Sequence, residues 1–232
     1  MTTLKNGSKG DEVKQLQTLL EGLTVDGIFG VKTRAAVIAY QAANGLDADG
    51  IVGPLTWAKL LSETTTTTFK QPTDYKQYDS RWASKMYSNH NDKSQTMRSS
   101  ACGPTAMADI VSTLIDSSVT PWTLAQKAMA WGDRTYNSGT AWSFFKHIAA
   151  EYGFGKMVQT TSLATLKSCL EGGGYAVASM GKGFWTSGGH YICIWKYDST
   201  YIYANDPASS SRKKQKISDF TSQRKACFCF WR

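Results

Sequence analysis

The sequence predicts an α+β protein in two parts, a small three-helix bundle followed by a larger domain in which helices pack on an antiparallel sheet. An uninterrupted threonine run, Thr64–Thr68, separates the two parts. Apolar residues recur at helical spacing before it, and a strong helical pattern followed by β-branched and aromatic segments comes after it. We therefore assign residues 1–63 to the bundle, 64–71 to a threonine-rich linker and 72–232 to the second domain, with a short edge strand as the alternative for the threonine run.

Composition places the chain among folded proteins that bury a core. Of its 232 residues, 41% are hydrophobic and 19% are charged. No stretch approaches the roughly 18 apolar residues of a membrane span, and Met1–Lys5 lacks the apolar core of a signal peptide. The five cysteines are an odd number, which argues against a dense disulfide framework and fits synthesis in a reducing cytosol.

The net charge of +8 belongs to the second part of the chain. Residues 1–63 carry six Lys/Arg and seven Asp/Glu, and the remaining residues carry twenty and eleven. The positive charge is densest at Arg212, Lys213, Lys214 and Lys216. Such a cluster suits an anionic bacterial wall or is simply a solvated loop, and no nucleic-acid motif accompanies it.

The first part contains an internal repeat, because Val25–Thr33 recurs as Ala48–Thr56. Each copy reads as an Asp-Gly turn followed by the start of a helix. A helix before the first copy carries the apolar stripe Val13, Leu16 and Leu20, and a helix between the copies carries Val37, Tyr40 and Gln41 and ends near Asn44-Gly45.

These motifs carry a family resemblance. Lys9-Gly10-Asp11-Glu12-Val13 with Leu16-Gln17, followed by the doubled Asp-Gly-x-x-Gly-x-x-Thr, resembles the peptidoglycan-binding domain type 1 over residues 4–61. The resemblance implies binding to bacterial peptidoglycan, although the turns alone would also explain the motif as the specification of a small bundle. We expect the ligand near the two repeat turns and the helix between them, at Phe29, Tyr40 and Asp49.

Cys102 begins the strong helical pattern of the second part. Met107, Ile110, Val111 and Leu114 follow at the spacing of one buried helix face. Pro104 suits the first turn, and Ser99-Ser100 are placed to cap it. Cys102 would then lie at the positive end of the helix dipole, where a reactive thiolate is favoured; a small buried hydrophobe is the alternative.

The other cysteines have no such setting. Cys169 falls in a predicted helix and Cys193 in a predicted strand, so both read as core. Cys227 and Cys229 read as alternating positions of a terminal strand, because their spacing lacks the gap usual in zinc sites. We predict no metal and no cofactor.

A predicted hairpin brings a histidine and an aspartate together. Tyr191–Tyr197 and Tyr201–Ala204 read as strands joined by a turn at 198–200, which places His190 opposite residues 206–208 and close to Asp206. A carboxylate beside an imidazole fixes its tautomer and stabilises its protonated form. The alternatives are a structural histidine at a strand end and a turn aspartate. His90 is predicted on the surface and His147 on a helix flank.

The same residues resemble the C39-like peptidases, whose fold is papain-like. The likeness rests on Tyr75–Trp82, Ser-x-Cys-Gly-Pro-Thr around Cys102, Gly-His-Tyr around His190 and Asn205-Asp206-Pro207, within residues 72–210. It implies Cys102 as nucleophile, His190 as base and acid, and Asp206 as orienter. A glutamine would complete the oxyanion hole: Gln77 matches the family position, and Gln95 is nearer in sequence.

Together the two resemblances imply a peptidoglycan hydrolase, most simply a phage endolysin that cuts an amide bond in the peptide part of the wall. It would be made in the host cytoplasm and act on the wall after release. The alternatives are an N-acetylmuramoyl-L-alanine amidase with the same triad, a leader-peptide processing protease, and a wall-binding adhesin without activity. The sequence makes no prediction about the oligomeric state.

Overall fold

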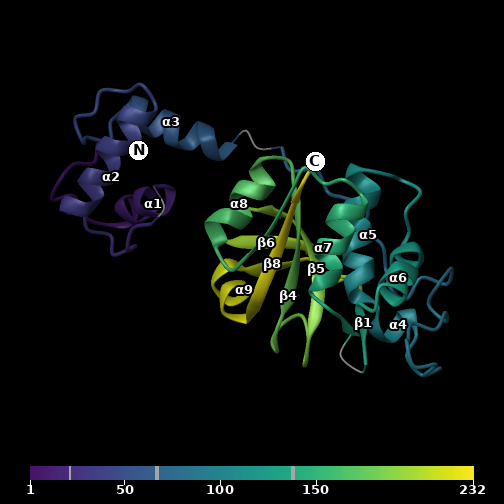
Figure 1. Cartoon of the computed structure of the whole chain (residues 1–232). Coiled ribbons are helices and arrows are strands. Elements are labelled where there is room, and N and C mark those ends of the chain that lie inside the picture. The colour runs from purple at the N-terminus through teal and green to yellow at the C-terminus, as the bar shows by residue number, and fades with distance from the viewer. Residues whose placement is uncertain (21, 66–67, 137–138) are drawn as a thin grey trace. The chain divides into compact units, whose positions relative to one another are not determined.

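Figure 1 shows a computed structural model of the chain, which describes residues 1–20, 22–65, 68–136 and 139–232. The chain divides into two compact units, Met1–Thr68 and Phe69–Arg232, which we describe separately. The predicted fold class is confirmed, since a helical unit precedes a unit built of helices and an antiparallel sheet. Thr64 and Thr65 belong to the last helix of the first unit, so the predicted linker is too long at its start. Thr66 and Thr67 lie outside the described residues.

The first unit is a bundle of three helices. They are α1 (Asp11–Leu19), α2 (Val31–Ala43) and α3 (Pro54–Thr65). As predicted, α2 ends close to Asn44-Gly45: Asn44 is its C-cap residue, and Gly45 follows with a positive φ. The helices enclose a small core that includes Val13, Leu16 and Val37.

A glutamine on the preceding helix organises each copy of the repeat. Its amide group donates to the aspartate carboxylate and the threonine hydroxyl of the motif, and its carbonyl oxygen accepts the glycine N–H, at 2.8–3.2 Å. Gln17 binds Asp26, Gly27 and Thr33 in this way, and Gln41 binds Asp49, Gly50 and Thr56. Both glutamines are buried. The doubled motif therefore encodes two equivalent buried hydrogen-bond networks.

The second unit is built on a six-stranded antiparallel sheet of order β3-β8-β4-β5-β6-β7. Its strands are β3 (Lys156–Thr160), β4 (Tyr175–Met180), β5 (His190–Tyr197), β6 (Tyr201–Asn205), β7 (Lys214–Lys216) and β8 (Arg224–Trp231). A separate two-stranded ribbon consists of β1 (Arg134–Thr135) and β2 (Gly139–Thr140). The helices are α4 (Met97–Ser100), α5 (Cys102–Leu114), α6 (Pro121–Ala130), α7 (Ser143–Glu151), α8 (Leu163–Glu171) and α9 (Ile217–Gln223).

Helices cover both faces of this sheet. Helices α5, α6 and α7 lie on one side, and α8 and α9 lie on the other (Figure 1). Each side has its own apolar core: Met107, Phe145 and Phe228 belong to the first, and Leu166 and Ile192 belong to the second. Full burial of such a side chain contributes about 1.5–3 kcal/mol. The central strand β4 is buried along its whole length because both of its faces are covered.

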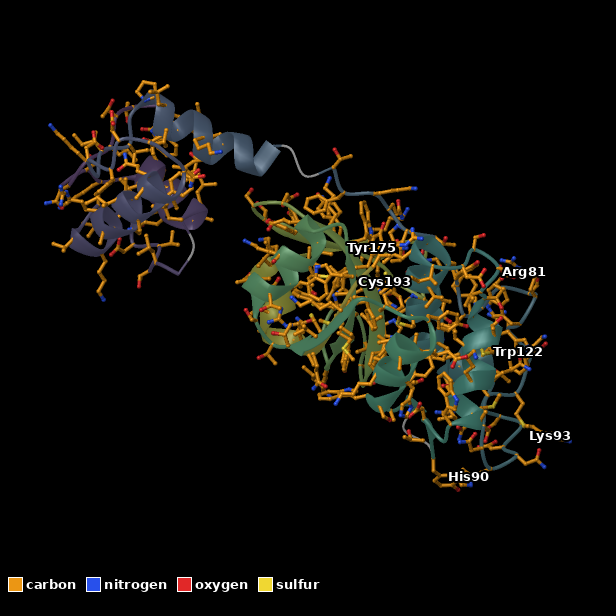
Figure 2. All side chains as sticks on the ribbon, turned by 45° about the horizontal axis from the view of Figure 1, so that its top comes forward. Arg81, His90, Lys93, Trp122, Tyr175 and Cys193 are labelled. Carbon is orange, nitrogen blue, oxygen red and sulfur yellow. The ribbon has the colours of Figure 1, made fainter. Side chains whose placement is uncertain are left out.

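The cysteines divide as the sequence predicted. All five are unpaired, and Cys169, Cys193, Cys227 and Cys229 are completely buried. Figure 2 shows Cys193 in the interior of the second unit. Only Cys102 is partly exposed, so it alone among them is open to a substrate.

None of the helices in the described ranges combines the length and the apolar composition that crossing a bilayer requires.

Candidate active site

Cys102 is the first residue of α5. The apolar stripe that follows it is buried at Met107, Ile110 and Val111, as predicted. The predicted serine cap is wrong: Ala101 occupies the N-cap position of α5 without a side-chain hydrogen bond. Ser99 instead accepts the N–H of Thr96 at 3.0 Å and so caps the preceding short helix α4. The first N–H groups of α5 are left without intrahelical acceptors, as at any helix start.

Gly103 allows the ribbon β1–β2 to pack against the nucleophile. A Cβ atom on residue 103 would lie 2.8 Å from the side chain of Thr140 on β2, which is too close for any other residue. Thr140 is itself held by Tyr87, whose hydroxyl lies 2.9 Å from the threonine Oγ1, and by the Tyr191 hydroxyl, which donates to its carbonyl at 2.8 Å. The cleft wall beside Cys102 is therefore fixed by packing.

The hairpin β5–β6 brings His190 to Asp206. Cys193 pairs with Asn205 across the hairpin, in the register that the sequence predicted, although a bulge interrupts the pairing beyond Ile194. His190 Nε2 lies 2.7 Å from Asp206 Oδ1. Both residues are buried, with exposed fractions of 8% and 1%. Since Nε2 faces the carboxylate, the other ring nitrogen, Nδ1, is left for Cys102.

The electrostatics of the three groups favour an ion pair between Cys102 and His190. Burial acts to raise the pKa of the Cys102 thiol, but the hydrogen bond and charge of His190, with backbone N–H groups of Tyr191 and Gly103, lower it overall. Burial acts to lower the pKa of His190, but hydrogen bonds to Asp206 and Cys102 raise it to about 9. Thiolate and imidazolium therefore stabilise each other.

Arg212 is a residue of this site that the sequence analysis assigned to a surface cluster. Its Nε donates to Asp206 Oδ2 at 2.6 Å, opposite the oxygen that faces His190. Burial acts to raise the pKa of Asp206, but His190, Arg212 and the Ala208 N–H together hold it below its ordinary value. In the sequence, the only indication of this contact is that Arg212 follows Asp206 by six residues across a turn. This spacing is too common to predict an ion pair.

The two glutamine candidates for the oxyanion hole have different surroundings. Gln77 is buried, its backbone N–H donates to Pro207 O at 3.0 Å, and its side-chain Nε2 donates to the carbonyl of Arg98. Its Oε1 has no hydrogen-bond partner among the described residues. Gln95 is engaged at both ends of its amide, by Asp92 at 3.0 Å and by Arg134. Gln77 is thus the candidate that contacts the turn of Asp206.

A cleft of about 900 Å³ opens at the nucleophile. Its lining comes from the end of α4, the start of α5, the ribbon β1–β2, the end of β4 and the starts of β5 and β8. It includes Gln95, Cys102, Arg134, Trp142, His190 and Lys225. Trp142 is 41% exposed. The cleft has the size and the mixed polar and apolar lining of a ligand-binding site.

The remaining histidines lie where the sequence predicted. His90 is exposed and lies at the edge of the second unit (Figure 2). His147 lies on α7 and its Nδ1 is 2.7 Å from Asp133 Oδ2. The hydroxyl of Ser143 donates to the other carboxylate oxygen, Asp133 Oδ1, at 2.5 Å, so it faces the carboxylate and not the imidazole. Among the described residues, no hydroxyl or thiol is hydrogen-bonded to the imidazole of this second pair.

The three ligand candidates of the first unit do not form one surface. Phe29 is completely buried in the core, so the expectation that it meets a ligand is wrong: its ring fills the space between the helices. Asp49 is exposed, but its carboxylate already accepts from Gln41 and from the N–H of Ile51. Tyr40 is half-buried on α2. Tyr40 and Asp49 remain candidates for contact with the wall.

Among the described residues, no group of three or more His, Cys, Asp or Glu side chains is arranged to hold a metal ion.

Comparison with known families accounts for both units. Residues 75–229, more than half of the chain, match the peptidase C39-like family. The chain belongs to the peptidase C39-like family. Residues 9–60 of this C39-like protein also match the peptidoglycan binding domain family. The two resemblances expected from the sequence are thus confirmed, and the chain combines a match to the peptidoglycan binding domain family with a C39-like peptidase domain.

Individual relatives cover one unit at a time. A zinc D-Ala-D-Ala carboxypeptidase of Streptomyces albus G is 48% identical over 65 residues, which are 25% of this chain and 26% of that protein. The crystal structure of a Burkholderia AP3 phage endolysin is similar at 45% identity over 27% of this chain and 25% of that one, with a TM-score of 0.26. A C39-like peptidase of Bacillus anthracis covers 58% of this chain and 90% of its own, at 15% identity and a TM-score of 0.45. The C39-like chain spans about half or less of the length of the curated relatives it matches.

Proposed function

We propose that this C39-like protein is a peptidoglycan hydrolase of the endolysin type, which cleaves an amide bond in the peptide part of the wall by a Cys-His-Asp thiol mechanism. The observation that carries the proposal is the sequence of contacts from Cys102 through His190 to Asp206 at an open cleft. The match of residues 9–60 to a peptidoglycan-binding family supports the choice of substrate.

In the first half of the reaction, Cys102 Sγ attacks the carbonyl carbon of the amide as the thiolate. His190, protonated in the resting ion pair, gives its proton to the amide nitrogen as the C–N bond breaks, and the amine leaves. In the second half, His190 takes a proton from water, the hydroxyl attacks the thioester, and the carboxylic acid product leaves as the thiolate is restored. Asp206 holds the imidazole in one orientation and stabilises its charge.

The oxyanion of the tetrahedral intermediate needs hydrogen-bond donors. The backbone N–H of Cys102 lies in the first turn of α5, where it has no intrahelical acceptor. The Gln77 amide carries two N–H groups, of which Arg98 O takes one. We assign these two groups as the donors, with an expected loss of about a hundredfold or more in kcat for Gln77→Leu.

The first unit would hold the enzyme on its polymer. Binding to an insoluble wall raises the local substrate concentration for a tethered catalytic domain without any new contact in the cleft. Deletion of residues 1–68 should therefore reduce lysis of intact walls more than it reduces cleavage of short soluble wall peptides, because only the polymer engages both units.

Mass spectrometry of digested sacculi tests the function and identifies the bond. New amino termini within stem peptides or cross-bridges indicate an endopeptidase, and glycan freed of whole stems indicates the N-acetylmuramoyl-L-alanine amidase alternative. Cys102→Ala should release neither product. Continued release by Cys102→Ala would overturn the thiol mechanism, whereas binding of the wild type to walls without any cleavage would favour the adhesin.

The charge state of the nucleophile gives a second test. Because the pKa of Cys102 is lowered and that of His190 is raised to about 9, iodoacetamide should inactivate the enzyme at pH values well below the ordinary thiol pKa of about 8.5. His190→Ala should move the pH dependence of alkylation of Cys102 upward. An alkylation profile with an ordinary thiol pKa in the wild type would contradict the ion pair.

A further inference from the structure

The cleft contains a buried cation that the proposed mechanism does not use. Arg134 lies on β1, lines the cleft and is only 3% exposed. Its Nε donates to Tyr87 O and its Nη1 to Gly139 O, each at 2.8 Å, and its Nη2 donates to Gln95 Oε1. The guanidinium also stacks over the Tyr87 ring, 4.6 Å from its centroid.

All three acceptors of Arg134 are neutral. No carboxylate of the described residues lies within ion-pair distance of the guanidinium, and the nearest negative partner in this network is Asp92, which acts through Gln95. Burial of a charged group is costly unless an opposite charge compensates it. The three hydrogen bonds offset part of this cost, and an anion bound in the cleft would offset more of it.

Arg134 lies close to the nucleophile. It pairs with Thr140 across the ribbon β1–β2, and Thr140 packs on Gly103, the residue after Cys102. The other charged side chain that lines the cleft outside the catalytic pair is Lys225, also a cation, and no Asp or Glu is among the described lining residues. The described lining therefore presents two cations and no carboxylate beside the reacting thiol.

A guanidinium has five N–H donors in a planar fork that matches a carboxylate. The three hydrogen bonds above account for three of the five donors, which leaves two. We infer that Arg134 is a specificity-determining residue that binds a free carboxylate of the wall peptide next to the scissile amide. This inference rests on the proposed function, and it narrows the substrate to peptides whose neighbouring carboxyl group is not amidated.

The experiment compares one set of soluble muropeptides before and after conversion of their carboxylates to methylamides. Soluble fragments remove any effect of amidation on wall binding by the first unit. With full-length wild-type enzyme, kcat/KM should fall about tenfold to a hundredfold on amidation, as expected for loss of a charge-assisted hydrogen bond. Arg134→Gln should cleave the two substrate sets at nearly equal rates, close to the wild-type rate on the amidated set.

Two controls keep the result interpretable. Arg81, which is labelled in Figure 2, is exposed and is not among the residues that line the cleft. Arg81→Gln should therefore keep the wild-type preference. Thermal unfolding and the rate of Cys102 alkylation by iodoacetamide report whether Arg134→Gln keeps its fold and its nucleophile. If it does not, equal cleavage of the two substrate sets by the wild type still overturns the inference. Equal cleavage of both sets by the wild type, or equal slowing of wild type and Arg134→Gln by amidation, would overturn the inference. Absence of cleavage of either set by the wild type would instead refute the proposed function.

Discussion

The second unit contains two histidine–aspartate pairs with the same separation and very different surroundings. His190 lies 2.7 Å from Asp206, and His147 lies 2.7 Å from Asp133. The His190 side chain is 8% exposed, whereas that of His147 is 51% exposed. His190 also contacts the thiol of Cys102, while the hydroxyl nearest to the other pair, on Ser143, faces the aspartate.

The comparison separates what a pair needs for structure from what it needs for catalysis. A buried aspartate and a histidine at hydrogen-bond distance are common to both pairs. Burial of the imidazole makes its interactions with a carboxylate and a thiolate strong, and the thiol of Cys102 gives it the proton that it later transfers. We therefore expect the pair His190–Asp206 to act in catalysis. We expect the pair His147–Asp133 to hold the start of α7 in place.

The largest difference in activity between the two pairs should appear when each histidine is replaced by alanine. His190→Ala should reduce kcat by about a hundredfold to ten-thousandfold through loss of the general acid and base. His147→Ala is the matched control: it should leave activity unchanged and lower the free energy of unfolding by at most about 1 kcal/mol, because the His147 side chain that contacts Asp133 is half-exposed. Wall lysis rates and urea unfolding measure the two effects. A comparable loss of activity in His147→Ala would remove the distinction between the pairs.

Replacement of each aspartate by asparagine should likewise reduce activity in the first pair and stability in the second. Asp206→Asn should lower kcat by at least about a hundredfold, since an amide neither fixes the productive tautomer nor stabilises imidazolium. Asp133→Asn should instead cost about 1–3 kcal/mol of stability at unchanged kcat, because it weakens the partly buried hydrogen bonds to Ser143 and His147. If Asp206→Asn retained nearly full kcat, Asp206 would not be the orienter.

Arg212 distinguishes the two histidine–aspartate pairs further. It forms an ion pair with Asp206, whereas no Lys or Arg of the described residues forms one with Asp133. Its hydrogen bond helps to lower the pKa of Asp206, so Arg212→Gln should raise that pKa and move the acid limb of the pH–rate profile upward. We expect about a tenfold loss in kcat/KM at neutral pH, for a lost charge-assisted hydrogen bond at a partly exposed site, with partial rescue by Arg212→Lys. Lys213→Gln, which removes an exposed neighbouring charge, should match the wild type. An unmoved acid limb in Arg212→Gln would show that the ion pair has no role in positioning.

The smallest expected effect comes from Asp109, whose pKa is shifted in the opposite direction to that of Asp206. It is completely buried on α5, where it accepts the Tyr75 N–H at 2.8 Å, and burial raises its pKa well above the ordinary value. A carboxyl group with a raised folded-state pKa stabilises the fold fully below its unfolded pKa of about 3.9 and loses that contribution as the pH rises through the folded value. Asp109→Asn should therefore be within about 1 kcal/mol of the wild type at neutral pH and should reduce the loss of stability with rising pH. Urea unfolding at several pH values checks this, and an unchanged pH slope would contradict it.

Local patterns were sufficient to predict much of this protein. The stripe after Cys102 predicted α5 because a helix that buries one face must place apolar residues at a period of 3.6. The hairpin turn at 198–200 predicted the meeting of His190 and Asp206 because antiparallel register follows from the position of the turn. The doubled motif of the first unit predicted two equivalent turns, although the buried Gln17 and Gln41 that hold them became evident only in the fold.

The errors fall where a residue's role depends on distant partners. Phe29 is near a repeat turn, but the packing of three helices decides that its ring is in the core. Ser99 precedes α5, yet the geometry of the chain assigns it to α4. Arg212 belongs to a basic run in the sequence, and only the return of the chain beside β6 gives it a carboxylate.

The sequence by itself determined the two-part organisation, the helix with Cys102 at its start and the pairing of His190 with Asp206, because each follows from periodicity, turns or register over a few residues. The tertiary structure decided which of two similar histidine–aspartate pairs meets a thiol and which cation supports it. It also decided that Arg134, which belongs to none of the sequence motifs, is a buried charge that lines the cleft. Burial and charge compensation are properties of a packed environment, and residues far apart in the chain create that environment together.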